Sequence, residues 1–485
     1  MKYESVICFE THVALNTRSK LFCSCPVEYG ALPNTHICPV CTGQPGVLPV
    51  LNKKAVEYGI LTGLALNCSI NQKSGFARKN YFYPDLPKGY QITQYESPLC
   101  ENGYLEISDG NNCTLPVGIK RIHLEEDAGK MVHTLDDADS AEPSYVDYNR
   151  SGISLLEIVA DHTRNPIQTL DQAHTYLTTL QQILRYIGIS DCSIEKGQFR
   201  CDVNVSLRPE GSKQFGNRTE IKNMTSFKFI LKAVEYEIKR QTQILVSGKQ
   251  VKQETRWFDE DKKITRLLRT KEDAPDYRYF PEPDLPDILI DPDFISNIKT
   301  TVPELPDEKR NRFMDQYHLT QDEAILLTRD KDISDFFEAC VPGCKDHKKL
   351  TRWIIKDLFT LLNETSQNLK DSSLSPEQFA VLINNISQGT ITEKTGRSVL
   401  KEIFETGESP DALIKRKNLK SIQDSALLEK LCSQVITDNQ EAAEKIRQGN
   451  TKPLNYLVGQ VMKKTSGKAD PGSVRRLIQD KLKAL

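Results

Sequence analysis

The chain has 485 residues and a formal net charge of -2, with 27% charged and 38% hydrophobic side chains. This length exceeds what one hydrophobic core usually organises, and the mixture is typical of globular domains rather than of disordered or fibrous chains. A near-neutral total also excludes an overall electrostatic signature of nucleic-acid binding. We therefore expect several packed domains, with any nucleic-acid surface confined to one of them.

The compartment is indicated by apolar runs and by cysteine usage. No apolar run approaches the roughly 20 residues of a membrane helix, and the first residues lack the plan of a secretory signal. The 13 cysteines are an odd number, which argues against a disulfide framework. We expect a cytoplasmic protein whose cysteines are thiols, metal ligands or both.

The first part of the chain, residues 1–295, has the pattern of an α+β domain. Two helical segments, 53–66 and 166–187, interrupt short strand-like runs that are separated by Gly, Pro, Asn and Asp. We predict a large, mainly antiparallel sheet. Its clearest strands are residues 5–15, 117–123, 155–159 and 200–207.

Four cysteines form a cluster in a segment rich in Pro and Gly. Cys23 and Cys25 are followed, after a gap of twelve residues, by Cys38 and Cys41. Four thiolates spaced in this way can close a tetrahedral site around one Zn²⁺, with no open position for catalysis. The sequence favours structural zinc over reduced cysteines in a tight loop, and a redox pair would leave the second pair of cysteines without a role.

Acidic side chains recur inside the strand-like runs. Glu10 and His12 are two residues apart, so both side chains project from the same face of a strand. Carboxylates that converge on one sheet face repel unless a cation neutralises them, and such oxygen ligands suit Mg²⁺ that holds nucleotide phosphates. His123 precedes a run of three acids, and the further acids in strand-like settings are Glu125, Glu126, Glu157, Asp202 and Glu220.

The chain contains neither a GxxxxGK[ST] loop nor a GxGxxG motif. If ATP binds, metal ions and basic side chains must hold its phosphates instead of a glycine-rich loop. Arg78, Lys79 and Lys88 are candidates for this role, since they lie in or near the run RKNYFYPDLPKGYQITQ. The aromatic residues of this run are equally consistent with packing and with binding a nucleotide base.

Prolines crowd residues 274–306, which indicates a domain boundary near residue 300. We predict an all-α domain over residues 296–407. Its helix-start signals are a capping box of Thr320 with Glu323, and a cap with an N1 proline at Ser375, Pro376 and Gln378.

A small helical tail domain is predicted over residues 408–485. Gly407 can end one helix, and Ser409 with Pro410 can start the next. From Lys445 onward the tail has ten basic and two acidic residues. This strongly basic end can contact phosphates or form a solvated helical face.

Long blocks of the sequence identify a family. Taken in chain order, they resemble the B subunit of the glutamyl/aspartyl-tRNA amidotransferase over essentially the whole chain. The blocks are ETHVAL, CSCPVEYGALPNTHICPVCTGQPGVLPVLN, RKNYFYPDLPKGYQITQ, HLEEDAGK, LLEIV, RCDVNVSL, EIKNM, DYRYFPEPDLP and NYLVGQVMK.

The resemblance implies a fold and a reaction. The first domain would be a cradle-shaped kinase-like domain, similar in fold class to glutamine synthetase, and the helical and tail domains would hold tRNA. The first domain would transfer phosphate from ATP to the side-chain carboxylate of Glu-tRNA(Gln) or Asp-tRNA(Asn). Ammonia would come from an amidase A subunit through a channel, and a small C subunit would complete the heterotrimer.

The resemblance also implies roles for particular residues. Glu10, His12, Glu125 and Glu157 would form a Mg²⁺ shell, with Asp202 and Glu220 as a second set. Lys79 would line the reaction chamber, and the four cysteines would match the zinc-bearing members of the family. The choice between Glu125 and Glu126 stays open from sequence.

Two other interpretations compete with this one. The chain could be a non-catalytic, zinc-containing tRNA-binding protein whose acids merely solvate a sheet. It could also be the relative that pairs with an asparaginase-like subunit, although the large inserted domain of that form is not evident in a chain of this length.

Overall fold

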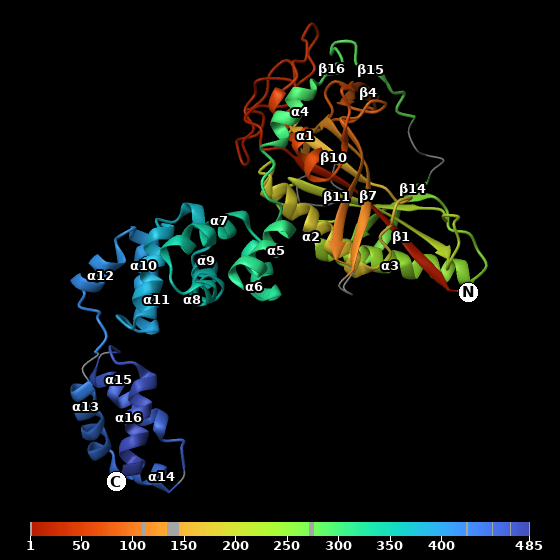
Figure 1. Cartoon of the computed structure of the whole chain (residues 1–485). Helices are drawn as coiled ribbons and strands as arrows, with labels where there is room; N and C mark the ends of the chain where they lie inside the picture. Colours follow the sequence, from red (N-terminus) through yellow and green to blue (C-terminus); the bar gives the residue numbers. More distant parts are fainter. Residues whose placement is uncertain are drawn as a thin grey trace. The chain divides into compact units, whose positions relative to one another are not determined.

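The computed structural model describes residues 2–108, 113–132, 145–270, 276–422, 425–448, 450–465 and 467–484. The chain divides into two compact units, Met1–Leu305 and Pro306–Leu485, and each is described by itself (Figure 1). Among the described residues, no helix combines the length and the apolar character needed to cross a membrane.

The first unit is built on a twelve-stranded sheet. Its main path has the order β14-β13-β12-β11-β1-β10-β7-β5-β4-β15, and β6 pairs with both β7 and β2. Neighbouring strands are antiparallel except for β12 and β13, which are parallel. The α+β prediction with a mainly antiparallel sheet is therefore confirmed. The strands are β1 (Tyr3–Ala14), β2 (Ser69–Ile70), β4 (Ala77–Asn80), β5 (Tyr90–Thr93), β6 (Cys100–Ser108), β7 (Thr114–Glu126), β10 (Ser154–Ala160), β11 (Phe199–Pro209), β12 (Thr219–Lys222), β13 (Glu254–Asp259), β14 (Ile264–Thr270) and β15 (Phe280–Pro281).

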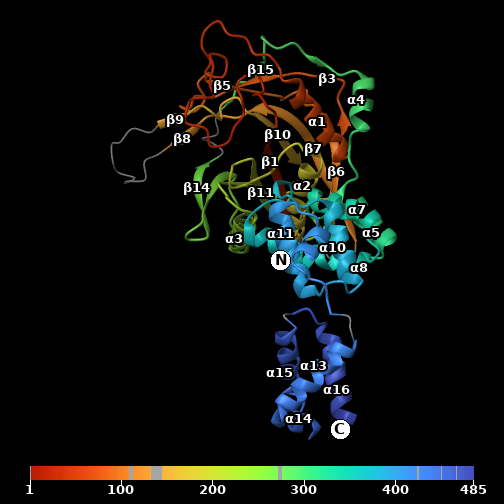
Figure 2. The same cartoon turned by 90° about the vertical axis from the view of Figure 1, so that its left-hand side faces the viewer.

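Two short ribbons lie outside this sheet. One pairs β3 (Lys73–Ser74) with β16 (Ile288–Leu289), and the other pairs β8 (Lys130–Val132) with β9 (Tyr145–Asp147), as Figure 2 shows for β8 and β9.

One face of the sheet is covered by helices α1 (Lys53–Ala65), α2 (Leu170–Tyr186) and α3 (Phe227–Val246). Alternate residues of β1 point into this core, where Phe9 stacks on Tyr176 of α2 with ring centroids 5.5 Å apart. Because side chains alternate along a strand, Glu10 and His12 project from the opposite face. We call this opposite face the polar face.

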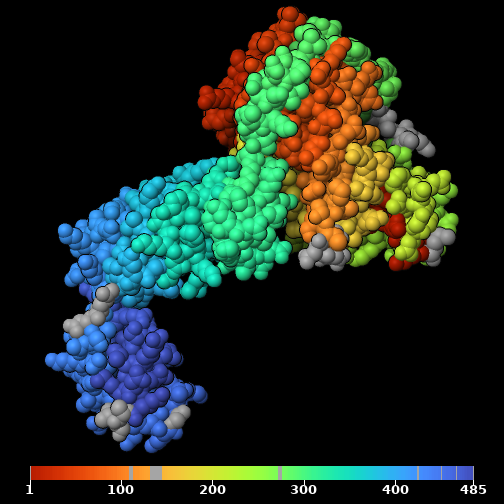
Figure 3. Space-filling model, in the orientation of Figure 1, coloured from red at the N-terminus to blue at the C-terminus, as the bar shows by residue number. Residues whose placement is uncertain are grey.

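Helix α4 (Pro292–Lys299) spans the expected boundary at residue 295 and packs against α1. Its Ile298 is buried in the core of the first unit. In Figure 3 the green surface of α4 lies directly beside the red and orange surface of the N-terminal segment.

All the secondary-structure elements described in the second unit are helices. The expected capping boxes are present, with Thr320 capping α6 and Ser375 capping α10, and Gly407 ends α11 in the left-handed region at a φ of 68°. The helices are α5 (Pro306–Tyr317), α6 (Gln321–Thr328), α7 (Lys331–Cys340), α8 (His347–Arg352), a π-helix (Trp353–Leu358), α9 (Phe359–Thr365), α10 (Pro376–Ser387), α11 (Glu393–Thr406), α12 (Pro410–Arg416), α13 (Ser425–Asp438), α14 (Gln440–Arg447), α15 (Leu454–Lys464) and α16 (Pro471–Ala484), with 3-10 turns at Val341–Gly343 and Leu369–Asp371.

Buried residues of this unit fall into separate clusters. One runs from Phe313 to Ile414, and the other from Leu428 to Leu482. In the second cluster, Leu457 and Val461 of α15 are fully buried.

Candidate functional site

Side chains from three neighbouring strands converge on the polar face. In the strand register, His12 on β1 lies opposite Glu157 on β10, and Glu157 lies opposite His123 on β7. Nε2 of His12 is 3.4 Å from Oε1 of Glu125 and 3.4 Å from Oε2 of Glu157. One ligand atom from each of these three residues lies within 4.8 Å of the others. We call His12, Glu125 and Glu157 the acid cluster, and its nitrogen and carboxylate ligands suit a divalent cation.

Within the acid cluster, His12 and Glu157 each favour the charged form of the other. Burial alone would lower the pKa of His12, but the carboxylates of Glu157 and Glu125 outweigh it and raise the pKa to about 9. Burial would raise the pKa of Glu157, whereas His123 and His12 hold it well below its usual range. A cation that takes the place of the His12 proton would meet the same two carboxylates, so proton release accompanies metal binding at such a site.

Glu10 lies beside the acid cluster and is held by another strand. Its Oε1 accepts a hydrogen bond of 3.0 Å from Nδ2 of Asn204. Burial raises the pKa of Glu10, and the nearby carboxylates of Glu157, Glu220 and Asp202 raise it further. The negative charge crowded here makes a cation on this part of the polar face favourable.

Asp202 and Glu220, the expected second set of metal ligands, already hold the ammonium of Lys222 between them. Nζ of Lys222 is ion-paired with Asp202 and lies 2.9 Å from Oε1 of Glu220. Burial would lower the pKa of Lys222, but both carboxylates raise it, so the ammonium is the stable form. This pair does not fit a second divalent ion while Lys222 stays in place.

The structure separates the two adjacent glutamates that sequence could not distinguish. Glu125 lies on the polar face as part of the acid cluster, and it accepts a hydrogen bond of 3.3 Å from Thr93. Glu126 points to the other face, where it pairs with Lys88 and accepts a hydrogen bond of 2.8 Å from the backbone N–H of Ile92. Strand alternation explains the difference, and Glu125 is the metal-ligand candidate.

The three basic candidates also lie in different places. Arg78 is bound by Glu282, with Nε 2.7 Å from Oε2, and Lys88 is bound by Glu126. Neither is brought to the acid cluster. Lys79 does face it: the ammonium is 4.9 Å from the ring centroid of Tyr277, and the Glu125 and Glu157 carboxylates raise the pKa of Lys79 against the effect of burial.

The aromatic run between these basic residues is partly exposed. Phe82 is 91% exposed and Tyr83 is 61% exposed, whereas Tyr90 packs under the Arg78 guanidinium at 4.2 Å. Nearer the acid cluster, Tyr95 stacks on Tyr279 at 3.9 Å.

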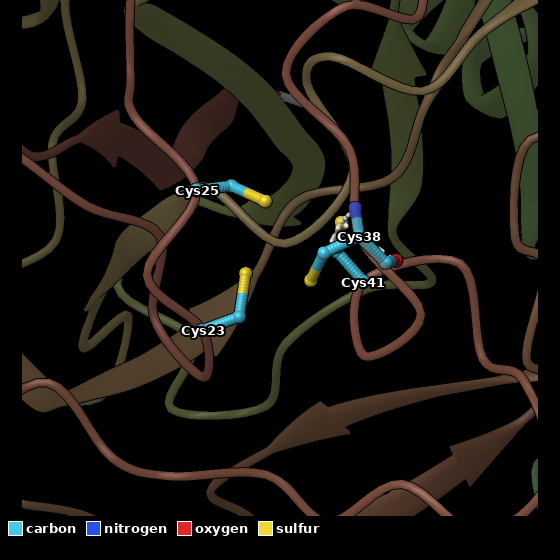
Figure 4. Close-up of side chains that lie close together, drawn as sticks. All are labelled: Cys23, Cys25, Cys38 and Cys41. Atoms are coloured by element: carbon cyan, nitrogen blue, oxygen red, sulfur yellow. Dashed lines mark hydrogen bonds between the residues drawn. The ribbon is translucent and has the colours of Figure 1, made fainter.

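The four cysteines lie together in the first unit, and Figure 4 shows their sulfur atoms turned toward a common centre. Every Sγ lies within 4.8 Å of the other three. Tetrahedral zinc with bonds of about 2.3 Å brings sulfur atoms to about 3.8 Å from one another. The four residues therefore fit a structural zinc ion after only small movements.

The four thiols differ in how readily they lose a proton: hydrogen bonding with Cys41 and burial raise the pKa of Cys23, whereas the pKa of Cys41 is lowered. Hydrogen bonding from Cys23 is the main cause that lowers the pKa of Cys41 to about 4, and the backbone N–H of Cys38 and the Lys20 ammonium add to it. Metal ligation requires the thiolate, so one ligand is already favoured in its binding form.

Sequence patterns drew attention to His123 without giving it a role, although it stands two residues before Glu125 on one strand. They gave no sign of Arg200, which lies opposite His12 and donates a hydrogen bond of 2.9 Å to Asp127. The spacing of His123 could have revealed its face, whereas the position of Arg200 depends on the pairing of distant strands.

Comparisons with known proteins agree with the sequence resemblance. A family model described as the GatB/GatE catalytic domain matches residues 5–296, and one described as a GatB domain matches residues 335–482. Proteins named as the B subunits of aspartyl/glutamyl-tRNA(Asn/Gln) amidotransferases are similar over their full lengths. Those of Carboxydothermus hydrogenoformans (485 aligned residues, 100% of both chains), Thermodesulfovibrio yellowstonii (478, 99% of both) and Persephonella marina (484, 100% of both) are each 48% identical to it. Matches of this extent show that the chain belongs to the B-subunit family of the aspartyl/glutamyl-tRNA(Asn/Gln) amidotransferases.

Proposed function

We propose that this chain is the ATP-using subunit of a heterotrimer that converts Glu-tRNA(Gln) or Asp-tRNA(Asn) into Gln-tRNA(Gln) or Asn-tRNA(Asn). Its partners would be an amidase A subunit, which hydrolyses glutamine, and a small C subunit. The observation that carries the proposal is the convergence of His12, Glu125 and Glu157 on the polar face. The full-length similarity to amidotransferase B subunits supplies the reaction class.

The chemistry requires activation of a carboxylate. Ammonia cannot displace oxide or hydroxide from the substrate side chain at neutral pH. An oxygen of the carboxylate therefore attacks the γ-phosphorus of ATP, ADP leaves, and the resulting acyl phosphate reacts with ammonia to give the amide and inorganic phosphate. Phosphoryl transfer gathers negative charge between two anionic reactants, so stabilisation is mainly electrostatic.

The acid cluster, together with Glu10, would hold Mg²⁺. That ion, when bound, would supply positive charge against the phosphates of ATP. Lys79, half-buried and near Glu125 and Glu157, would place a second positive charge next to the reacting groups. His123 would orient Glu157 through the contact of 3.2 Å between Nε2 and Oε2. The cysteine cluster would bind Zn²⁺ as a structural support.

The basic tail would bind the tRNA backbone. Lys452, Lys463, Arg475 and Arg476 are exposed on the last helices and the loop before them. Exposed cations of this kind give affinity that depends on salt and tolerates different sequences. Removing residues 409–485 should therefore raise the KM for tRNA and weaken its salt dependence.

The test uses the reconstituted heterotrimer with ATP, Mg²⁺ and each misacylated tRNA. ADP release and amide formation should occur with glutamine or ammonium as the donor. Glu157→Gln should abolish both products, while glutamine hydrolysis by the amidase partner persists. Full amidation by Glu157→Gln would reject the assignment.

The alternative of a non-catalytic zinc protein is not favoured. The family model over residues 5–296 is described as a catalytic domain, and the side chains of the acid cluster are mostly buried rather than solvated. A heterotrimer that binds tRNA but never consumes ATP would restore that alternative.

A further inference from the structure

Three adjoining cavities on the polar face form a trough beside the acid cluster. Their volumes are about 220, 200 and 440 Å³. Arg218 lines all three, and Glu10 lines the second and third. Glu157 of the acid cluster lines the third. The trough therefore leads directly to the carboxylates that we assign to the metal.

The wall of this trough carries basic side chains beside the carboxylates of Glu10, Glu157, Glu220 and Glu254. It contains Lys120, Arg121, Arg218 and Arg269. In the described part of the chain, no ion pair joins Lys120 or Arg218 to a carboxylate. Arg78 and Lys88, by contrast, form ion pairs with Glu282 and Glu126. Both unpaired cations are exposed and available to a ligand.

A second observation places these cations together. Burial lowers the pKa of His162, and the charges of Arg218 and Lys120 lower it further, against the opposite effect of Asp161. Lys120, His162 and Arg218 all line the third cavity, so the two cations lie near each other in the trough. Phe215, 40% exposed, lies edge-on to His162 at 5.1 Å and offers an aromatic surface on which a base could stack.

We propose that Arg218, with Lys120, binds phosphate groups of a ribonucleotide in this trough, a role for which the sequence offered Arg78, Lys79 and Lys88 as candidates. The inference rests on the proposed function, since phosphoryl transfer needs phosphates beside the acid cluster. A guanidinium gives two parallel hydrogen bonds to a phosphate, and an ammonium adds a point charge. The polyphosphate of ATP and the backbone at the 3′ end of tRNA share this chemistry.

The test uses the reconstituted heterotrimer with ammonium as the nitrogen donor, which bypasses glutamine hydrolysis. Arg218→Gln and Arg218→Lys are compared with Lys213→Gln, which removes an exposed charge from the same loop outside the trough. The KM for ATP is measured at saturating Glu-tRNA(Gln), and the KM for tRNA at saturating ATP. Tripolyphosphate serves as a competitor that carries phosphates without a nucleoside, and melting curves check the fold.

Arg218→Gln should raise one of the two KM values about tenfold or more, the usual effect of losing a charged hydrogen bond. Arg218→Lys should lose less, because it keeps the charge. A rise in the KM for ATP, with weaker inhibition by tripolyphosphate, assigns the trough to ATP. A rise in the KM for tRNA alone assigns it to the tRNA 3′ end.

Two results would overturn the inference. If the wild-type complex is active and Arg218→Gln matches Lys213→Gln in both KM values, the trough binds no phosphate and the proposed function stands. If the wild-type complex shows no ATP-dependent amidation with any tRNA, the proposed function fails and the inference fails with it.

Discussion

Nζ of Lys20 lies 3.5 Å from Sγ of Cys41, and the lysine side chain has no exposed surface. The same Nζ donates a hydrogen bond of 3.2 Å to the carbonyl oxygen of Tyr148. Four thiolates around one Zn²⁺ carry a net charge of about -2. A buried ammonium against one of them offsets part of that charge without being a ligand.

We therefore expect Lys20→Met to release zinc roughly 10- to 100-fold faster to a chromogenic chelator, since changes beside metal ligands commonly have effects of this size. Cys38→Ser should lose zinc at purification, as measured by elemental analysis. Lys53→Met, which removes a surface lysine, is the matched control. A Cys38→Ser variant with full zinc content would contradict the four-cysteine site.

Neighbouring glutamates should respond differently to the same substitution. Glu125→Gln removes a carboxylate from the acid cluster and should lower kcat by roughly 10²- to 10³-fold with little change in melting temperature. Glu126→Gln leaves Lys88 unpaired in a buried site and should lower the free energy of unfolding by about 3 kcal/mol. Steady-state kinetics and denaturant titration separate the two, and the reverse pattern would show that Glu126 is the ligand.

The number of bound metal ions depends on Lys222. With its ammonium between Asp202 and Glu220, the wild-type heterotrimer should bind no divalent ion at that pair. Lys222→Met should then take up about one additional Mn²⁺, since two nearby carboxylates attract a cation. Titration followed by electron paramagnetic resonance counts the ions. If Asp202→Asn lowers the count in an otherwise wild-type chain, the pair is a metal site after all.

Acid should weaken the helical unit through Asp335. Burial would raise the pKa of this carboxyl, but hydrogen bonds from Lys309 and Lys331 outweigh it and lower the pKa. A lowered pKa stabilises the fold above the unfolded value of 3.8, and this contribution is lost as pH falls through the folded value. Because the carboxyl is 43% exposed, the contribution is only about 0.5 kcal/mol.

Tryptophan fluorescence can measure this effect. The chain has two tryptophans, Trp257 in the first unit and Trp353 buried in the second. In a Trp257→Phe background, Trp353 reports the unfolding of the helical unit. Asp335→Asn should lower stability at pH 7 and leave it nearly unchanged at pH 3, and an equal loss at both pH values would show that the ion pairs do not contribute.

Local patterns were sufficient for several elements. The capping boxes at Thr320 and Ser375 were predicted correctly because a cap depends on residues within one turn. The strand carrying Glu10 and His12 was recognised as a short strand-like run, residues 5–15. The spacing of the four cysteines predicted a cluster, since a short Pro- and Gly-rich segment limits how far its thiols can separate.

Such local patterns could not predict the register between strands. From the sequence alone we could not choose Glu125 over Glu126, or predict that Lys222 lies between two carboxylates. Nor could we predict that Arg218 lines the trough. Each of these depends on pairing between strands that are far apart in the chain, and a shift of one residue in that pairing moves every side chain to the other face.

The sequence by itself determined the family, the α+β class and which types of side chain are present for the chemistry. The tertiary structure alone decided which of those side chains meet. Local preferences act over a few residues. The acid cluster instead brings together His12, Glu125 and Glu157 from three different strands, and the positions of these strands follow from long-range hydrogen bonding and burial.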